Sequence, residues 1–212
     1  MKLKTILGAV VLTFACCFVS QASVTNALWW SANSQNLVCS DGFSGGTLTM
    51  NGTQMGMDAA MAGTIQTDTT LDPTLTLGSS VNNDTGLAWI GYQVNVIMGV
   101  PFSFVPPGPT VNNPPPNDWI VASVVAPTLQ ASGPYAGQYE GTLLFSDGTP
   151  VGVGGELDWQ YSINFGSSLD YSFTQEMIPV TAPIPEPSAL GLIGLGGLVL
   201  VGRMVRQSRK VA

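Results

Sequence analysis

The sequence predicts a mainly β fold, a β-sandwich or jelly roll, for residues 23–178. Short apolar runs recur between turn-forming Gly, Asn, Ser, Thr and Pro, and none has the 3.6-residue repeat of a long amphipathic helix. Several runs instead alternate apolar and polar residues with the period of two that marks a half-buried strand. Seven or more such strands separated by turns are typical of β-sandwiches and jelly rolls.

Alternation is clearest from Leu157 to Phe165, where apolar side chains at odd positions alternate with polar ones. After the turn residues 166–168 the alternation resumes as far as Phe173, which predicts a hairpin. A second hairpin is predicted from Gly141 to Val153, because Asp147-Gly148 between two short apolar runs favours a type I′ turn.

Further strands are predicted in four places, Thr64 to Thr69, Thr74 to Leu77, Ile90 to Val96 and Trp119 to Val125. Two segments depart from the strand pattern. Residues 105–116 contain six prolines, which cannot donate to a central ladder, so we expect a surface loop or an edge crossing. Residues 51–63 contain three methionines and two adjacent alanines, for which we expect one or two turns of helix.

Residues 1–22 are predicted to be a signal peptide. Lys2 and Lys4 precede an apolar run from residue 6 to residue 19, and the small residues Ser20 and Ala22 suit signal peptidase cleavage after Ala22. Ala27 is a second possible cleavage point, and an uncleaved N-terminal anchor is the alternative. Cleavage after Ala22 leaves Cys39 as the lone cysteine, so we expect neither a disulfide nor a metal site there.

Charge is distributed very unevenly along the chain. Residues 23–182 contain twelve Asp and Glu and no Lys or Arg, which gives a formal charge of −12, and the whole chain has no His. The lack of cations argues against nucleic-acid binding, since nothing would neutralise phosphates. Without His or Lys, catalytic triads, Schiff bases and imidazole zinc sites are excluded. Carboxylate chemistry and calcium binding remain open.

The C-terminal part has three consecutive segments. Residues 179–187 contain four prolines and predict an extended linker. Residues 188–202 are uncharged and rich in Gly and Leu; as a helix they would span about 22 Å of a hydrocarbon core of about 30 Å, which predicts one short transmembrane helix. Residues 203–212 hold the four remaining cations, Arg203, Arg206, Arg209 and Lys210. By the positive-inside rule these place the C-terminus in the cytoplasm and the β-domain outside.

Pro185-Glu186-Pro187, the apolar segment and the basic end together resemble the PEP-CTERM sorting signal of bacterial proteins handled by exosortases. The resemblance covers about the last 28 residues. It implies that Pro185, Glu186 and Pro187 are recognised by an exosortase and that the basic residues set the topology. It also implies a stay in the inner membrane followed by display at the cell surface or release. A single-span anchor that is never processed is the alternative.

Candidate chemistry in the β-domain is sparse. Glu156 and Asp158 share a strand face, and paired carboxylates are what glycoside hydrolysis needs; Glu140 is a third candidate. For calcium the nearest clusters are Asp68 with Asp72, residues 82–84, and Asp147, although turns use the same residues. Five tryptophans could form a sugar platform if exposed, with Trp159 expected in the core. Two Thr-Leu-Thr segments, 47–49 and 74–76, are expected to be ordinary strand residues.

The sequence therefore predicts an exported surface or extracellular-matrix protein whose β-domain is structural or mediates interactions. We expect no catalytic activity, cofactor or metal. The expected partners are signal peptidase, exosortase, the membrane and extracellular polysaccharide, but not nucleic acid. A carbohydrate-binding module is the first alternative, and a glycan-acting hydrolase is the second.

Overall fold

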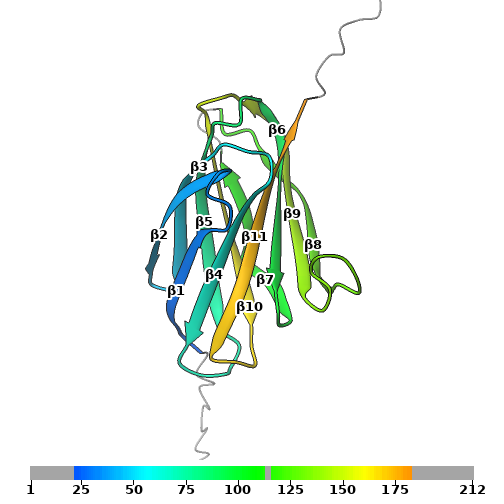
Figure 1. Ribbon diagram of the computed structural model, residues 1–212. Helices are drawn as coiled ribbons and strands as arrows, with labels where there is room; N and C mark the ends of the chain where they lie inside the picture. The colour runs from blue at the N-terminus through cyan, green and yellow to red at the C-terminus, as the bar shows by residue number, and fades with distance from the viewer. Residues whose placement is uncertain (1–21, 113–115, 183–212) are drawn as a thin grey trace, which may run out of the picture.

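The computed structural model describes residues 22–112 and 116–182, which form eleven β-strands and no helix (Figure 1). Six strands form one sheet, in the order β1 (Val24–Ser31), β4 (Ala59–Thr67), β11 (Asp170–Thr181), β6 (Trp89–Met98), β9 (Tyr139–Val151) and β8 (Ile120–Leu129). Five strands form the other, in the order β2 (Leu37–Ser44), β3 (Thr47–Gln54), β5 (Thr74–Asn83), β10 (Glu156–Phe165) and β7 (Phe102–Asn112). The prediction of a mainly β fold is confirmed.

The two sheets enclose a common apolar core in a sandwich-like arrangement. Neighbouring strands are antiparallel except β3 and β5, which run parallel. Buried and less buried residues alternate along β4, β5 and β11, as expected of strands with one face in a core. The rings of Tyr92 on β6 and Trp159 on β10 lie 4.9 Å apart, so aromatic packing joins the two layers.

Hydrogen bonds inside the core also join the sheets. The hydroxyl of Tyr92 donates to Gln54 Oε1 at 2.5 Å, and that of Tyr161 donates to Gln175 Oε1 at 2.5 Å. Each pair joins a residue of one sheet to a residue of the other, and all four side chains are at most 1% exposed. Because buried polar groups are costly to leave unpaired, these bonds fix how the layers face one another.

Most of the predicted strands are present. β10, β11, β6, β5 and β8 overlap the runs at 157–165, 169–173, 90–96, 74–77 and 119–125, and β4 includes most of 64–69. One detail differs in β6, where Ile90 is 37% exposed while Trp89 before it and Gly91 and Tyr92 after it are buried. A register shift between Trp89 and Gly91 explains this, because a bulge interrupts the alternation.

Both predicted hairpins are wrong. Residues 166–168 connect β10 in one sheet to β11 in the other, so these strands are not paired. Residues 146–149 lie inside β9, which continues to Val151. Asp147 has a φ of 67°, as the turn chemistry suggested. It lies, however, in a bulge of β9, where the pairing with β6 shifts register between Trp89 and Gly91.

The two segments expected to interrupt the strand pattern are largely strand. Residues 51–63 contain the end of β3 and the start of β4, so the predicted helical turns are wrong. Met50 and Met61 are buried in the core, which the strand alternation accounts for. The proline-rich segment contains most of β7, the edge strand of the five-stranded sheet, where missing N–H donors are tolerated. Over residues 105–112 the edge interpretation is confirmed and the loop interpretation is wrong; residues 113–115 lie outside the described residues.

The described chain begins and ends at opposite ends of the molecule (Figure 1). β11 continues to Thr181, so the first three residues of the predicted linker at 179–187 belong to the last strand. Ala22, the predicted cleavage residue, lies just before β1, and the rest of the predicted signal peptide lies outside the described residues. Within residues 22–112 and 116–182 no helix has the length and hydropathy to cross a membrane; the predicted span at 188–202 lies outside them.

Candidate functional site

The outer face of the five-stranded sheet carries two rows of small polar side chains. Strand register places the residues of each row side by side across β3, β5, β10 and β7. One row is Asn51, Ser80, Asp158 and Asn112, and the other is Thr49, Gly78, Gln160 and Thr110. Period-two alternation turns these side chains outward while their strand neighbours enter the core.

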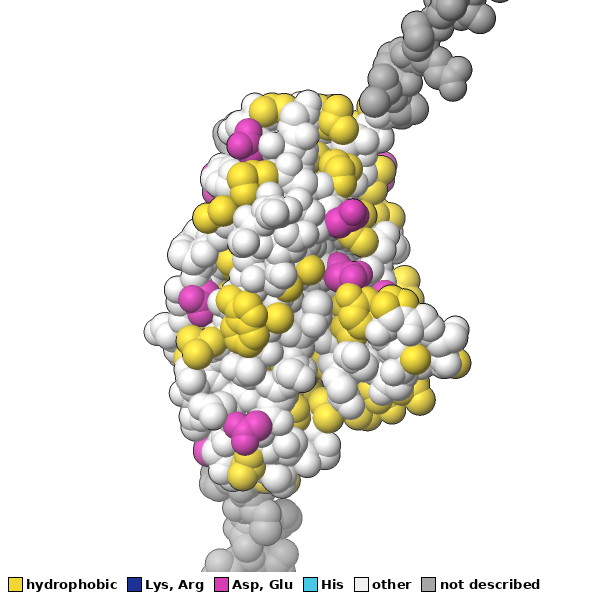
Figure 2. All heavy atoms as spheres, viewed as in Figure 1, with side chains coloured by type: hydrophobic (Ala, Val, Ile, Leu, Met, Phe, Trp, Pro, Cys, Tyr) yellow, Lys and Arg dark blue, Asp and Glu magenta, His cyan; other side chains and the backbone are white. Residues whose placement is uncertain are grey.

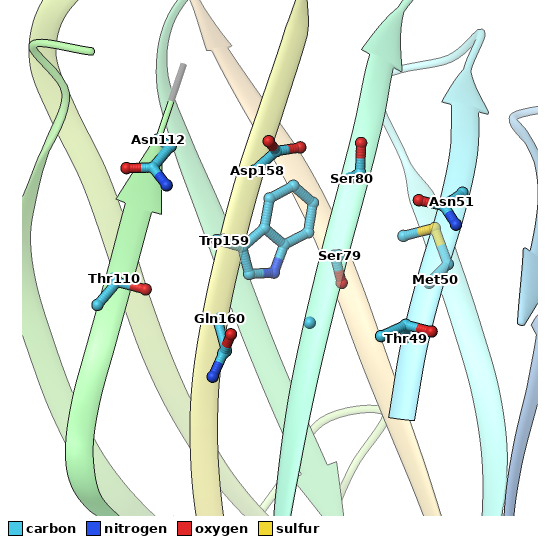
Figure 3. A pocket seen from close by; sticks show the side chains of 11 residues that line it. Thr49, Met50, Asn51, Ser79, Ser80, Thr110, Asn112, Asp158, Trp159 and Gln160 are labelled. Atoms are coloured by element: carbon cyan, nitrogen blue, oxygen red, sulfur yellow. The ribbon is translucent and has the colours of Figure 1, made fainter. Parts of the chain in front are cut away.

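A shallow hollow of about 270 Å³ lies between these rows (Figure 3). Its floor includes Gly78, where an added Cβ would meet only Thr49 Cγ2, at 3.9 Å. The missing side chain leaves space that hydroxyl and carboxamide groups surround. Trp159 also lines the hollow, but its ring is 2% exposed and faces the core, so it offers no stacking surface.

One carboxylate lines the hollow and a second lies next to it. Asp158 lines it, while Glu156 accepts a hydrogen bond from the Ser80 hydroxyl. Burial raises the pKa of Asp158; the Ser80 hydroxyl opposes this rise, and the charge of Glu156 adds to it. As predicted, Glu156 and Asp158 share a face of one strand. Glycoside hydrolysis instead needs carboxyl groups that flank the scissile bond.

The hollow is suited to hydrogen bonding with a neutral, polyhydroxylated ligand. Its side chains offer hydroxyls and carboxamides, both of which donate and accept. Anions are disfavoured because the surrounding domain has a formal charge of −12. Sequence alternation identifies Asp158 and Gln160 as outward-facing, but the register that brings Asn51 and Asn112 beside them is not encoded locally.

The tryptophans do not form a sugar platform. Trp29, Trp89, Trp119 and Trp159 are at most 4% exposed, which confirms the expected core position of Trp159. Trp30 on β1 is the exposed one, at 49%. Carbohydrate recognition by stacking on several exposed tryptophans is therefore not supported by the fold.

Two of the residues considered for calcium, Asn83 and Asp68, serve local structure. Asn83 is fully buried; its amide donates to the carbonyls of Leu87, Val151 and Gly152. Asp68 accepts from the backbone N–H of Ser23 at 2.8 Å. Across the described chain, no group of three or more Cys, Asp or Glu side chains is placed to hold a metal ion.

A tethered loop on the opposite sheet has no counterpart in the sequence analysis. The β8–β9 loop reaches across the six-stranded sheet, and its Tyr135 hydroxyl donates to Glu176 on β11 at 2.5 Å. Glu176 also accepts from Asn95, which is 6% exposed. Burial and the carboxylates of Glu176 and Glu140 raise the pKa of Tyr135 to about 12.

Comparison with known proteins gives a match at the C-terminal end of the chain and none to the β-domain. No curated protein and no solved structure matches the chain. The model of the PEP-CTERM protein-sorting motif matches residues 183–210, which include Pro185-Glu186-Pro187 and the four basic residues. These residues lie outside the described structure. Such a motif indicates exosortase-dependent sorting to the surface. Residues 183–210 of this chain therefore carry a PEP-CTERM protein-sorting motif, as the resemblance implied.

Proposed function

We propose that this protein is a non-enzymatic component of the cell surface or extracellular matrix, exported with a cleaved signal peptide and processed by exosortase. The observation that carries the proposal is the sorting motif at residues 183–210, which follows directly on a folded β-domain ending at Thr181. In this proposal residues 188–202 form the single transmembrane helix, and the basic residues after them stay in the cytoplasm.

The amino-acid composition of the β-domain supports a structural or interaction role. Residues 23–182 contain no His, Lys or Arg, which leaves few groups for acid–base or nucleophilic catalysis. The adjacent carboxylates of Glu156 and Asp158 lie on one strand of an open sheet face. The same face presents a broad hydrogen-bonding surface, which suits adhesion to other matrix components.

Deleting the host exosortase tests the processing step. We expect the full-length protein to stay in the membrane fraction and to migrate more slowly on an immunoblot. Replacing Pro185, Glu186 and Pro187 by Ala should reproduce the defect, whereas Pro183→Ala, outside the Pro-Glu-Pro triplet, should not. Unchanged mobility and location in the exosortase mutant would overturn the proposal.

A second candidate function is binding of a neutral surface polysaccharide in the hollow at Gly78. The observation that favours it is the double row of hydroxyl and carboxamide groups around a glycine floor. Gly78→Val should fill the hollow and remove retardation in affinity electrophoresis with neutral polysaccharides. Trp30→Ala, at the exposed tryptophan, should leave the retardation intact. If Trp30→Ala abolished the retardation and Gly78→Val left it intact, polysaccharide would not bind in the hollow at Gly78.

A further inference from the structure

β8 is exposed or half-buried along its whole length and is an edge strand of its sheet. It is the last strand of the six-stranded sheet and hydrogen bonds to β9 alone; β7 of the other sheet lies beside it without forming a ladder (Figure 1). None of its ten residues is buried, unlike every other strand of the described chain. The backbone groups on its outer side are therefore available to another strand.

The exposed side chains of β8 are mostly aliphatic. Ile120, Val124, Val125 and Leu129 are between 45% and 57% exposed. Hydrophobic side chains also gather on the right-hand side of the molecule in Figure 2, where Figure 1 shows β8 and β9. Natural sheets protect long edges with charges, prolines and bulges. Pro127 and the register shifts after Val121 and Val125 break the edge, but no charge lies on it.

Charge identifies which partner suits this edge. From residue 85 to residue 139 the chain contains one charged residue, Asp118, so β6, β7 and β8 are uncharged. Two more acids lie on the neighbouring strand β9, where Glu140 pairs with Thr128 and Asp147 follows Ser146, the partner of Ile120; the middle of β8 pairs with the uncharged Leu143 and Leu144. The other nine acids of residues 23–182 lie on other strands and loops, where two copies would repel each other. The middle of β8 is thus a neutral strip along which a second domain of charge −12 can approach.

We propose that β8 pairs with β8 of a second copy of this chain. Antiparallel pairing about a two-fold axis brings the same segment of both copies together, as an isologous dimer requires. It satisfies the free backbone groups of both strands, joins two six-stranded sheets into one and covers the exposed valines. Residues 120–126, ahead of Pro127, form the paired segment. The inference does not depend on the role of the tail.

Cysteine scanning of the exported full-length chain tests this pairing. Single cysteines replace Ile120, Val124, Val125 or Leu129 in a Cys39→Ser background. Directly opposite residues of an antiparallel pair have Cα atoms about 4.5–5.5 Å apart, within the range for a disulfide. Non-reducing gels should show a disulfide-linked homodimer that peaks at one or two of these positions. Val38→Cys is the matched control, because Val38 is 59% exposed on β2, an edge of the other sheet.

A charge variant gives an independent readout. Val125→Glu, combined with the best cysteine at another position, should lower the homodimer yield several-fold by placing two carboxylates within the paired segment. Val38→Glu in the same chain should leave the yield unchanged. Equal dimer yields for β8 cysteines and Val38→Cys would overturn the proposal. Adducts of another mass would overturn it too, since the partner would then be a different protein.

Discussion

At the scale of single residues, the two Tyr–Gln hydrogen bonds between the sheets are the sharpest test of the packing. Tyr161→Phe removes the donor to Gln175 Oε1 in a core where Gln175 is fully buried. We expect a loss of about 1–3 kcal/mol in the free energy of unfolding, measured by urea denaturation. Adding Gln175→Leu removes the stranded acceptor and should restore part of the loss. A double variant less stable than the single one would contradict the account.

Asp158 gives a prediction about pH. Its raised pKa means that the folded state holds the proton more tightly than the unfolded chain, whose pKa is near the ordinary 3.8. Stability should therefore fall as pH rises from 3.8 through the folded pKa, because ionisation is penalised only in the folded state. Asp158→Asn should raise the melting temperature at pH 7 and weaken this decline. Asp147→Asn serves as the control; equal effects of both variants would refute the assignment.

At the scale of elements, the bulge in β9 depends on a glycine. A Cβ at Gly148 would lie 2.2 Å from Trp119 Cδ1 and 2.8 Å from the Trp119 backbone nitrogen. Trp119 is buried, and its indole N–H donates to the carbonyl of Thr149 at 2.7 Å, so it cannot yield easily.

Gly148→Ala should therefore lower the free energy of unfolding by about 1–3 kcal/mol, as measured by thermal or urea denaturation. Gly152→Ala is the matched control, because a Cβ there meets nothing within 4 Å. Similar losses in both variants would show that backbone entropy, not the contact with Trp119, decides the effect.

The same elements show how far the sequence predicts the fold. Alternation is a local property, so β10 and β6 could be located from their own residues. Which strands pair with each other cannot be read from local sequence, because consecutive strands lie in different sheets at nearly every connection. Residues 166–168 therefore looked like a hairpin turn but join two layers. Asp147-Gly148 signals a positive φ, which a bulge uses as readily as a turn.

The candidate site, too, could be predicted only in part from the sequence. The outward positions of Asp158 and Gln160 could be predicted from strand periodicity. Their neighbours Asn51, Ser80 and Asn112 come from three other strands, and only the sheet order brings them together. The exposed state of Trp30 and the burial of Trp29 likewise depend on which face of β1 meets the core.

At the scale of the whole molecule, repulsion among the acidic side chains lowers the stability of the β-domain. Residues 23–182 hold twelve acids and no Lys or Arg, so internal ion pairs cannot offset the repulsion among carboxylates. Raising the ionic strength should increase the melting temperature, because salt shortens the screening length from about 30 Å at 0.01 M to about 3 Å at 1 M. A melting temperature independent of sodium chloride would show that the acids are too far apart to interact.

The most direct test of the proposed processing is the intact mass of the surface or released protein before and after denaturation and trypsin treatment. Trypsin cuts after Lys and Arg, and residues 23–202 contain neither. A protein that has lost its signal peptide and its basic end should keep the same mass after trypsin. A species that trypsin shortens at Arg203 would retain the basic end and would contradict processing at the sorting motif.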